Sequence, residues 1–328
     1  MQARFRYPEE AGAGGGAAPE NALRGRFLHN EPMGRHVSWR AGGVAQRLYL
    51  PADIADLCLL LKSLPMDEPL HMVGLGSNLL VRDGGVKGVV VVLHGALRGL
   101  ALESRTHGIP EAPAESAPSA VVYAEAGVAA PKLARFCANH DLAGAEFWAG
   151  IPGTVGGALA MNAGCYGAET WQRAIQVLTV DRTGRLNERL PQEYVIDYRH
   201  VSLRAAHAEW FLAGWFRLPR GDGAAARDTI RELLRRRIAS QPLNFPNAGS
   251  VFRNPPGDFA ARLIEACGLK GARAGQAQVS EKHANFIVNL GGATATDIER
   301  LMEKVEDGVE ARTHVRLIRE VRVIGERA

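Results

Sequence analysis

The chain has few cysteines, and their spacing excludes the common cysteine-based sites. Its 328 residues contain four, and no two are close enough for a zinc knuckle or a redox pair, so we expect no bound metal. Three fall in helix-like apolar stripes and are predicted to be small buried residues. This usage is typical of the reducing cytosol, so the protein is expected to be cytoplasmic. The four are Cys58, Cys137, Cys165 and Cys267.

Long apolar runs are absent as well. The N-terminus carries no apolar signal core, and no uninterrupted apolar stretch approaches the length that crosses a membrane. The protein is therefore expected neither to be secreted nor to insert into a membrane. Its one dense basic run, residues 235–237, lacks interleaved aromatic side chains, so a solvated helix face is favoured over a nucleic-acid groove.

Glycine is what the sequence has in quantity. There are 37 glycines, many in short clusters that indicate tight backbone turns. Hydrophobic residues make up 46% and charged residues 23%, which is a normal globular balance, and the length suggests two or three domains. The net charge of +4 suits anionic ligands such as phosphates or nucleotides.

Helices and strands are interspersed without a regular strand–helix–strand order, which favours an α+β fold over a doubly wound parallel sheet. Apolar spacing predicts helices at residues 54–61, 227–239, 260–267 and 298–305. Gly268 is expected to end the third, and Thr296 with Glu299 forms a capping-box pattern at the start of the fourth. Strands are predicted at 86–93, 121–125, 175–180, 211–218, 285–289 and 315–324.

Three segments of biased composition are predicted to lie between the regular elements. Residues 1–20 are rich in Gly, Ala, Pro and Glu and are interpreted as a flexible tail. Residues 103–119 have no periodicity and predict a mobile surface loop. A change of composition at 219–226 indicates a domain boundary.

The first glycine cluster follows a strand-like segment and contains Gly74, Gly76, Ser77 and Asn78. Glycines let a backbone approach a ligand closely and present several N–H groups to one anion, and Ser and Asn add side-chain donors. It is no Rossmann fingerprint, because Leu79 stands where the third glycine should be, and there is no Walker lysine. From these residues alone, a ligand loop and a simple strand–turn–strand connection are equally supported.

The second cluster begins at Gly-Ile-Pro-Gly-Thr-Val-Gly-Gly, residues 150–157, and continues to Glu169. So many small residues in one segment could wrap a flat or phosphorylated cofactor with backbone amides. A tight crossover that needs small residues for packing is the alternative, and ligand binding is favoured.

Three single residues could act chemically, although taken alone they favour structural roles. Ser250 lies in a turn after Gly249 and lacks the nucleophile-elbow pattern of hydrolases. Arg199 follows a short strand, and Glu320 lies in a predicted strand near Arg322. A surface charge or a cross-strand ion pair explains each of these two.

Taken in order, these segments resemble the UDP-N-acetylenolpyruvoylglucosamine reductase family. The resemblance covers roughly residues 27 to 326. The motifs that carry it are Asn-Glu-Pro at 30–32, Ala-Gly-Gly at 41–43, Gly-Ser-Asn at 76–78, the glycine stretch at 150–157, Tyr-Arg at 198–199, Gly-Ser-Val-Phe-Arg-Asn-Pro at 249–255, Leu-Lys-Gly at 269–271, His-Ala-Asn-Phe at 283–286, Glu-Val-Arg at 320–322 and Gly325.

The resemblance implies an α+β fold in which a vanillyl-alcohol-oxidase-type FAD-binding domain of two subdomains precedes a C-terminal α/β substrate-binding domain. The expected limits are 21–82 and 83–219 for the subdomains and 220–328 for the substrate domain, whose final strand returns to the active site. One form of the family inserts a loop with a closing tyrosine between the catalytic Arg and Ser. Only about fifty residues separate Arg199 from Ser250, so this chain looks like the shorter form.

The resemblance also implies the reaction. UDP-N-acetylglucosamine enolpyruvate would be reduced to UDP-N-acetylmuramate, a step of peptidoglycan precursor synthesis, with NADPH as co-substrate and non-covalent FAD. Hydride passes from the flavin N5 to the terminal enol-ether carbon. Arg199 binds the carboxylate, Glu320 hydrogen-bonds it, and Ser250 delivers the proton. Burial would raise the pKa of Glu320 and arginine neighbours would lower it, a balance that the sequence leaves open.

Ligand contacts follow from the matching positions. FAD would contact Gly74, Gly76, Ser77, Asn78, Ile151, Gly153, Thr154 and Gly157, and the substrate would contact Tyr166, Asn254, Lys270 and His283. The basic run at 235–237 could also bind the substrate diphosphate in the shorter form, although a solvated face stays favoured for it. Two residues depart from the family pattern. Arg253 stands where Lys is usual, and His314 stands where Gly is usual. Arg253 keeps the charge with a different geometry.

Two other functions stay open. One is an oxidase of the same flavin-binding class acting on a sugar or alcohol, and the other is a non-catalytic protein that binds nucleotide sugars. The presence of Arg199, Ser250 and Glu320 together favours the reductase, because binding alone does not require all three. The oligomeric state is not readable from the sequence, and a monomer is the working expectation.

Overall fold

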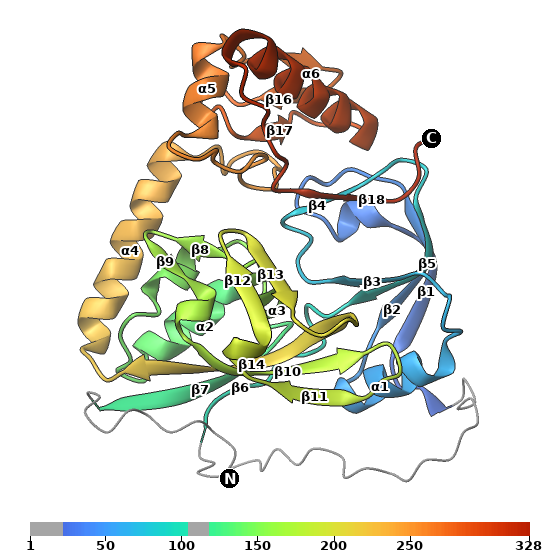
Figure 1. The fold of residues 1–328 in the computed structure, drawn as a ribbon, viewed down its shortest axis with the longest axis vertical. Helices are drawn as coiled ribbons and strands as arrows, with labels where there is room; N and C mark the ends of the chain where they lie inside the picture. Colours follow the sequence, from blue (N-terminus) through green and yellow to red (C-terminus); the bar gives the residue numbers. More distant parts are fainter. Residues whose placement is uncertain (1–21, 104–117) are drawn as a thin grey trace.

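The computed structural model describes residues 22–103 and 118–328. The predicted tail at 1–20, and all but the ends of the predicted loop at 103–119, lie outside the described residues. The described chain forms two larger sheets with helices, several smaller sheets and a smaller C-terminal unit, as Figure 1 shows. This mixed content confirms the predicted α+β class. No helix in the described ranges is long and apolar enough to cross a membrane.

The first sheet has the strand order β1-β2-β5-β3. Its central strand β5 is almost wholly buried, as its run of four valines requires. Helix α1 covers one face and begins at Asp53, whose side chain accepts a hydrogen bond from the Asp56 N–H group. The bounds are β1 Arg26–Pro32, β2 Val44–Leu50, α1 Ile54–Ser63, β3 Leu70–Val73, β4 Leu79–Val81 and β5 Val86–Val92.

The second sheet is antiparallel, with the order β11-β10-β14-β7-β6. Its long central strand β14 is buried on both faces. Trp215 packs with residues around α1, and Phe216 packs with residues around α2. The strands are β6 Leu100–Leu102, β7 Ser119–Glu125, β10 Ala174–Asp181, β11 Leu186–Arg189 and β14 Glu209–Pro219, and α2 is Ala130–Ala138.

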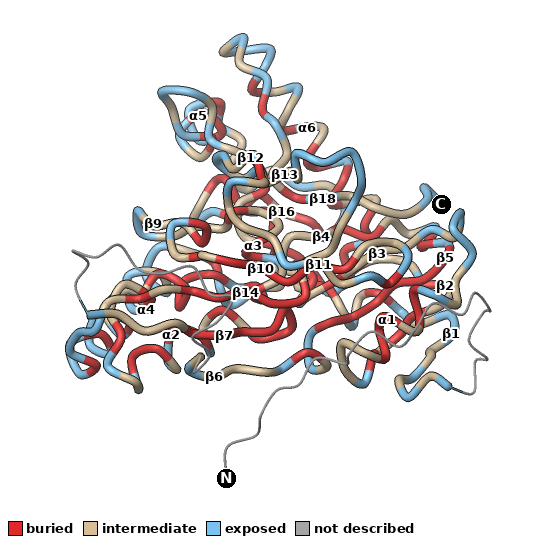
Figure 2. The backbone as a smooth tube through the Cα atoms, turned by 60° about the horizontal axis from the view of Figure 1, so that its bottom comes forward, coloured by how far each residue is buried: buried red, intermediate tan, exposed pale blue. Residues whose placement is uncertain are grey.

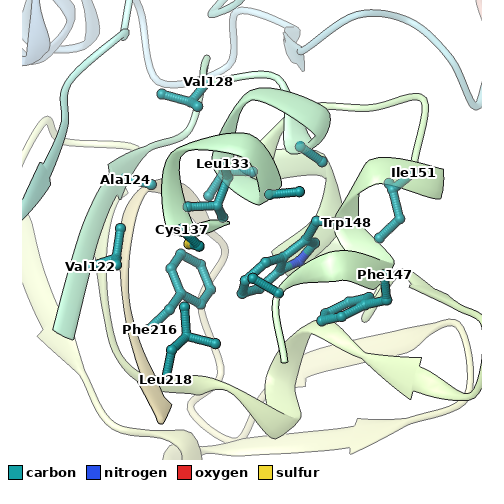
Figure 3. Packing of buried hydrophobic residues seen from close by; sticks show 14 of the residues in the cluster. Val122, Ala124, Val128, Leu133, Cys137, Phe147, Trp148, Ile151, Phe216 and Leu218 are labelled. Atoms are coloured by element: carbon teal, nitrogen blue, oxygen red, sulfur yellow. The ribbon is translucent and has the colours of Figure 1, made fainter. Parts of the chain in front are cut away.

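Four short strands and one short helix lie beside this second sheet, between α2 and β14 in the chain. They are α3 Val155–Ala160, the pair β8 Gly164–Cys165 with β9 Ala168–Glu169, and the hairpin β12 Tyr194–Asp197 with β13 His200–Leu203. The core under them includes Trp148 and Phe216, whose ring centroids are 5.0 Å apart (Figure 3). Figure 2 shows buried backbone concentrated along the strands of both sheets.

The C-terminal unit begins beyond α4, a long helix that runs from the second sheet toward it (Figure 1). A separate apolar cluster joins α5, α6 and the small sheet β15-β16-β17 to Trp39 and Leu80 of the first region. The last strand, β18, pairs in parallel with β4, so the chain end returns to the first region. The bounds are α4 Gly223–Ser240, α5 Ala260–Ala266, β15 Arg273–Ala274, β16 Ala277–Val279, β17 Ile287–Asn289, α6 Ala295–Thr313 and β18 Arg322–Ile324.

Two local predictions were wrong. The capping box of α6 is formed by Thr294 and Asp297, two residues earlier than predicted, because Thr296 instead bonds Asp83 through its N–H and hydroxyl groups. The predicted strand at 315–324 is regular only over β18. Its alternation is still visible in burial, since Leu317 and Val321 are buried while Ile318 is exposed.

Candidate active site

The two glycine clusters, far apart in sequence, meet in space. The turn between β3 and β4 carries residues 74–78, and the segment 151–157 leads into α3. A Cβ atom added at Gly74 would collide with Thr154 Oγ1, and one added at Gly153 would lie 3.4 Å from Ser77 Oγ. Ile151 is buried in the core beside Trp148, which anchors the second loop (Figure 3). Glycine is thus required at position 74, whereas a Cβ atom at position 153 would make only ordinary van der Waals contact.

The first loop presents a row of unused backbone donors. Among the described residues, no acceptor is bonded by the N–H groups of residues 74–78. Gly76 has φ +59°, and a Cβ there would collide with the carbonyl oxygen of His36. Consecutive free N–H groups in such a turn form a cradle for an anion. The residues therefore fit the diphosphate of a dinucleotide such as FAD.

Arg199 is held at the tip of the β12–β13 hairpin in the left-handed region, at φ +53°. Its Nε donates to Glu320 Oε1 at 2.8 Å. Its Nη2 donates to the carbonyl of Gly164 at 3.1 Å, and its Nη1 to that of Asn162 at 3.4 Å. A non-glycine residue in this backbone conformation is strained, and such strain is concentrated at functional sites.

Asn162 connects the segments around Arg199. It is buried, with φ +41°, and its Nδ2 donates to Glu169 Oε2 at 2.7 Å and to the carbonyl of Asp197 at 3.3 Å. Its Oδ1 accepts from the Trp171 N–H group at 3.1 Å. The hairpin that carries Arg199 is thereby joined to the β8–β9 segment.

Glu320 is the half-buried carboxyl of the site. The side chains of Glu320 and Arg199 are 15% and 17% exposed. Burial raises the pKa of Glu320, and the positive charges of Arg199 and Arg253 lower it by less, so the net direction is upward. The balance that the sequence left open is therefore shifted toward the protonated acid relative to a free carboxyl.

Ser250 lies near Glu320 because the segment that follows Ser250 pairs with the segment that contains Glu320. Residues 251–253 run antiparallel to 318–320, and the Val251 carbonyl accepts from the Glu320 N–H group at 2.8 Å. Ser250 directly precedes this pair, and its hydroxyl is bonded to no described residue. Asn78 Nδ2 donates to the Glu320 carbonyl at 3.1 Å, which links the first loop to this segment. Arg199, Ser250 and Glu320 are therefore brought together.

The predicted substrate residues are distributed around this centre. Tyr166 donates through its hydroxyl to the Leu233 carbonyl on α4 at 3.0 Å, and burial raises its pKa to about 12. Asn254 uses its side-chain oxygen to accept from the Ala260 N–H group at the start of α5. Burial lowers the pKa of His283, and the charge of nearby Lys270 lowers it further. Tyr166 is thus joined to α4, and Lys270 and His283 lie near each other in the C-terminal unit.

A cleft of about 290 Å³ opens beside Ser77, Pro152 and Gly249. Several of its polar lining residues were not identified from the sequence as site residues: Ser38, Arg40, Asn244 and Asn247. The sequence singled out Arg237 only as part of a basic run favoured as a solvated face. Arg235 and Arg236 are exposed and paired with Glu232, whereas Arg237 turns inward, bonds the Gly150 carbonyl and lines the cleft.

Comparison with known proteins shows that the chain is similar to reductases. The family model described as "UDP-N-acetylenolpyruvoylglucosamine reductase, C-terminal domain" matches residues 241–324, and one described as "FAD binding domain" matches residues 45–188. A UDP-N-acetylenolpyruvoylglucosamine reductase of Thiobacillus denitrificans is 73% identical over 318 residues, which is 97% of each chain. One of Nitrosospira multiformis is 55% identical over 92% of this chain and 90% of its own. The crystal structure of the Thermus caldophilus enzyme superimposes with a TM-score of 0.72 at 28% identity, covering 92% of this chain and 99% of that one.

Proposed function

Because this chain belongs to the UDP-N-acetylenolpyruvoylglucosamine reductase family, we propose that it reduces UDP-N-acetylglucosamine enolpyruvate to UDP-N-acetylmuramate with NADPH through bound FAD. The observation that carries the proposal is the half-buried Arg199–Glu320 pair beside Ser250, next to the donor-rich loop at 74–78. The predicted family and FAD-binding fold class are confirmed, and the chain is an oxidoreductase.

The residues that would hold FAD are those of the two glycine loops. The free N–H groups of 74–78 suit its diphosphate, and the second loop lies against the first at Gly74 and Thr154, so both loops could contact one bound cofactor. When bound, FAD supplies two-electron chemistry, taking hydride from a reduced nicotinamide and giving it to a carbon–carbon double bond. In the proposal, the protein orients the substrate and stabilises the negative charge that develops on it.

Arg199 and Glu320 would act on the substrate carboxylate. An enol ether accepts hydride poorly unless its carboxylate is polarised. Arg199 can bind that group, and its charge stabilises the enolate that develops when hydride reaches the terminal carbon. Glu320, whose pKa is raised by burial, would donate to the same carboxylate when it is protonated and would then add no second negative charge. The hydrogen bonds from Arg199 to the Asn162 and Gly164 carbonyls would keep its guanidinium in place while this charge develops.

Ser250 would complete the reaction. Its hydroxyl proton moves to the carbon next to the carboxylate, the enolate collapses to the lactyl ether, and the serine oxygen recovers a proton from solvent. A hydroxyl is a weak acid, but an enolate held in contact with it is a strong enough base. The hydroxyl is bonded to none of the described residues, which supports this role because its proton is available for transfer.

The remaining expectations are part of the same proposal. We propose that Tyr166, Asn254, Lys270 and His283 lie along the bound substrate, and that the subdomains and substrate domain divide the chain at about residues 82 and 219. The C-terminal unit would close over the substrate through the β4–β18 pairing, which brings Glu320 to the FAD-binding side. Cytoplasmic location and a monomeric state stay predictions.

An anaerobic colour assay tests the function. Purified protein should bleach when NADPH is added, and the oxidised flavin band should return when UDP-N-acetylglucosamine enolpyruvate follows. A protein that bleaches but regains colour only when oxygen is admitted would be an oxidase. A protein that purifies without flavin and cannot be loaded with it would contradict the proposal and leave a nucleotide-sugar binding function.

A further inference from the structure

Arg253 is a cation beside the catalytic group that the proposed mechanism does not use. Its backbone N–H group donates to the Ile318 carbonyl at 2.8 Å, and its neighbour Phe252 forms an antiparallel bridge with Arg319. Val251 pairs with Glu320 in the same ladder. Residues two apart on one strand of such a pair lie on the same face, and diagonal neighbours are within reach of long side chains. Arg253 is therefore a diagonal neighbour of Glu320.

The side chain of Arg253 lacks partners. In the described ranges it makes no hydrogen bond and no ion pair, and its Nε is buried with nothing to donate to. A buried guanidinium N–H group without an acceptor is costly, so each such group in a folded protein calls for an explanation. Four other buried side-chain atoms are unpaired in the same ranges, and they belong to residues of the FAD-binding region: Arg173, Gln176, Arg182 and Tyr194.

Arg253 differs from Arg199 in having no hydrogen-bond partner for its guanidinium among the described residues. All three nitrogens of the Arg199 guanidinium already donate to protein oxygens. Arg253 presents a complete guanidinium next to the same carboxyl, with every donor free of described partners. Its positive charge acts on that carboxyl, since it lowers the pKa of Glu320 against the larger opposing effect of burial. An arginine held in place by its backbone and free at its tip suits a planar anion, which it can bind with two parallel hydrogen bonds.

We propose that Arg253 is, in addition to Arg199, an anion-binding side chain of this site that holds an anionic oxygen group of the substrate. This inference rests on the proposed function and extends it. The substrate carries two such groups, its carboxylate and its diphosphate, and both have the oxygen geometry that a guanidinium matches. Arg253 would bind the substrate in its ground state as well as during reaction, so its loss should raise KM more than it lowers kcat.

Direct binding to the oxidised holoenzyme tests the inference without turnover. Calorimetric titration with UDP-N-acetylglucosamine enolpyruvate should give a Kd that is roughly tenfold or more higher in Arg253→Met than in wild type, because a charge-assisted hydrogen bond is lost. Arg253→Lys, which keeps the charge, should restore part of the affinity. Arg262→Met is the matched control, since Arg262 lies exposed on α5 and pairs only with Asp258 among the described residues.

Titration with UDP identifies the group that is bound. If Arg253 holds the diphosphate, the Kd for UDP should rise in Arg253→Met with that for the substrate. If it holds the carboxylate, the Kd for UDP should stay at the wild-type value while that for the substrate rises. Substrate affinity in both Arg253 variants equal to that of Arg262→Met and wild type would overturn the inference. A wild-type enzyme that binds the substrate yet never regains its colour would overturn the proposed function and leave the role of Arg253 standing.

Discussion

Replacing Glu299 with glutamine should destabilise the junction between the C-terminal unit and the FAD-binding region. Glu299 lies on α6, and its side chain is only 7% exposed. Arg82, at the end of β4, donates to both of its carboxylate oxygens at 2.9 and 2.8 Å. This bond is the main reason that the pKa of Glu299 falls to about 2. Because β4 pairs with β18, the same contact supports the segment that follows Glu320.

The size of the effect follows from that pKa. A carboxyl whose pKa falls from 4.5 to about 2 on folding gains about 3 kcal/mol of stability at neutral pH. Arg82 is 30% exposed, so screening by water reduces the loss expected in Glu299→Gln to about 1–3 kcal/mol. The contribution of a group with a lowered pKa is complete above its unfolded value. It should therefore disappear as the pH falls from about 4.5 toward 2.

Urea unfolding of the holoenzyme at fixed FAD concentration measures this loss. The control is Glu303→Gln, one turn away on the same helix, where the carboxylate is 43% exposed and pairs with Arg327 alone among the described residues. That change should cost less than about 1 kcal/mol. The gap between wild type and Glu299→Gln should be largest at pH 7 and should narrow at pH 3. Equal losses in the two variants, or a gap that does not change with pH, would refute the reasoning.

Three further changes have defined outcomes. Gly76→Ala should lower flavin retention after gel filtration at least roughly tenfold, because φ +59° and the His36 carbonyl leave no room for a Cβ atom. Asn162→Asp should lower kcat roughly tenfold and move the Glu320-dependent limb of the pH–rate profile to higher pH. The reason is that a carboxylate cannot donate to the Asp197 carbonyl, so the hairpin that carries Arg199 is held less firmly. Adding Glu169→Gln should recover the melting temperature but not kcat. Glu320→Gln should remove the loss of stability that wild type shows as the pH rises above 4.5, because a raised carboxyl pKa stabilises the folded state only while the group stays protonated; thermal unfolding across that range measures it.

Local sequence patterns predicted most of the framework because they depend on neighbouring residues. The apolar run at 211–218 became a strand buried on both faces, and the spacing at 54–61 became α1. Capping of α6 escaped prediction because it depends on Asp83, which is 213 positions before Thr296. The alternation at 315–324 indicated which residues are buried, but regular pairing over only three residues depends on where β4 ends.

In the candidate site as well, features that depend on neighbouring residues were predictable from the sequence, and contacts between distant residues were not. Both glycine clusters were recognisable because close backbone approach requires glycine. Their contact, and that of Arg199 with Glu320 across 121 positions, required the fold. Arg237 could not be separated from its two solvated neighbours by sequence, since only the direction of α4 turns it toward the cleft.

The most direct test of the central claim is a single-turnover experiment on Ser250→Ala. The variant should bind FAD and bleach with NADPH at the wild-type rate, because the serine takes no part in that half of the reaction. On addition of UDP-N-acetylglucosamine enolpyruvate under anaerobic conditions, recovery of the oxidised band should fall by at least roughly a thousandfold. Recovery at the wild-type rate, with UDP-N-acetylmuramate as product, would show that another group delivers the proton and would contradict the account.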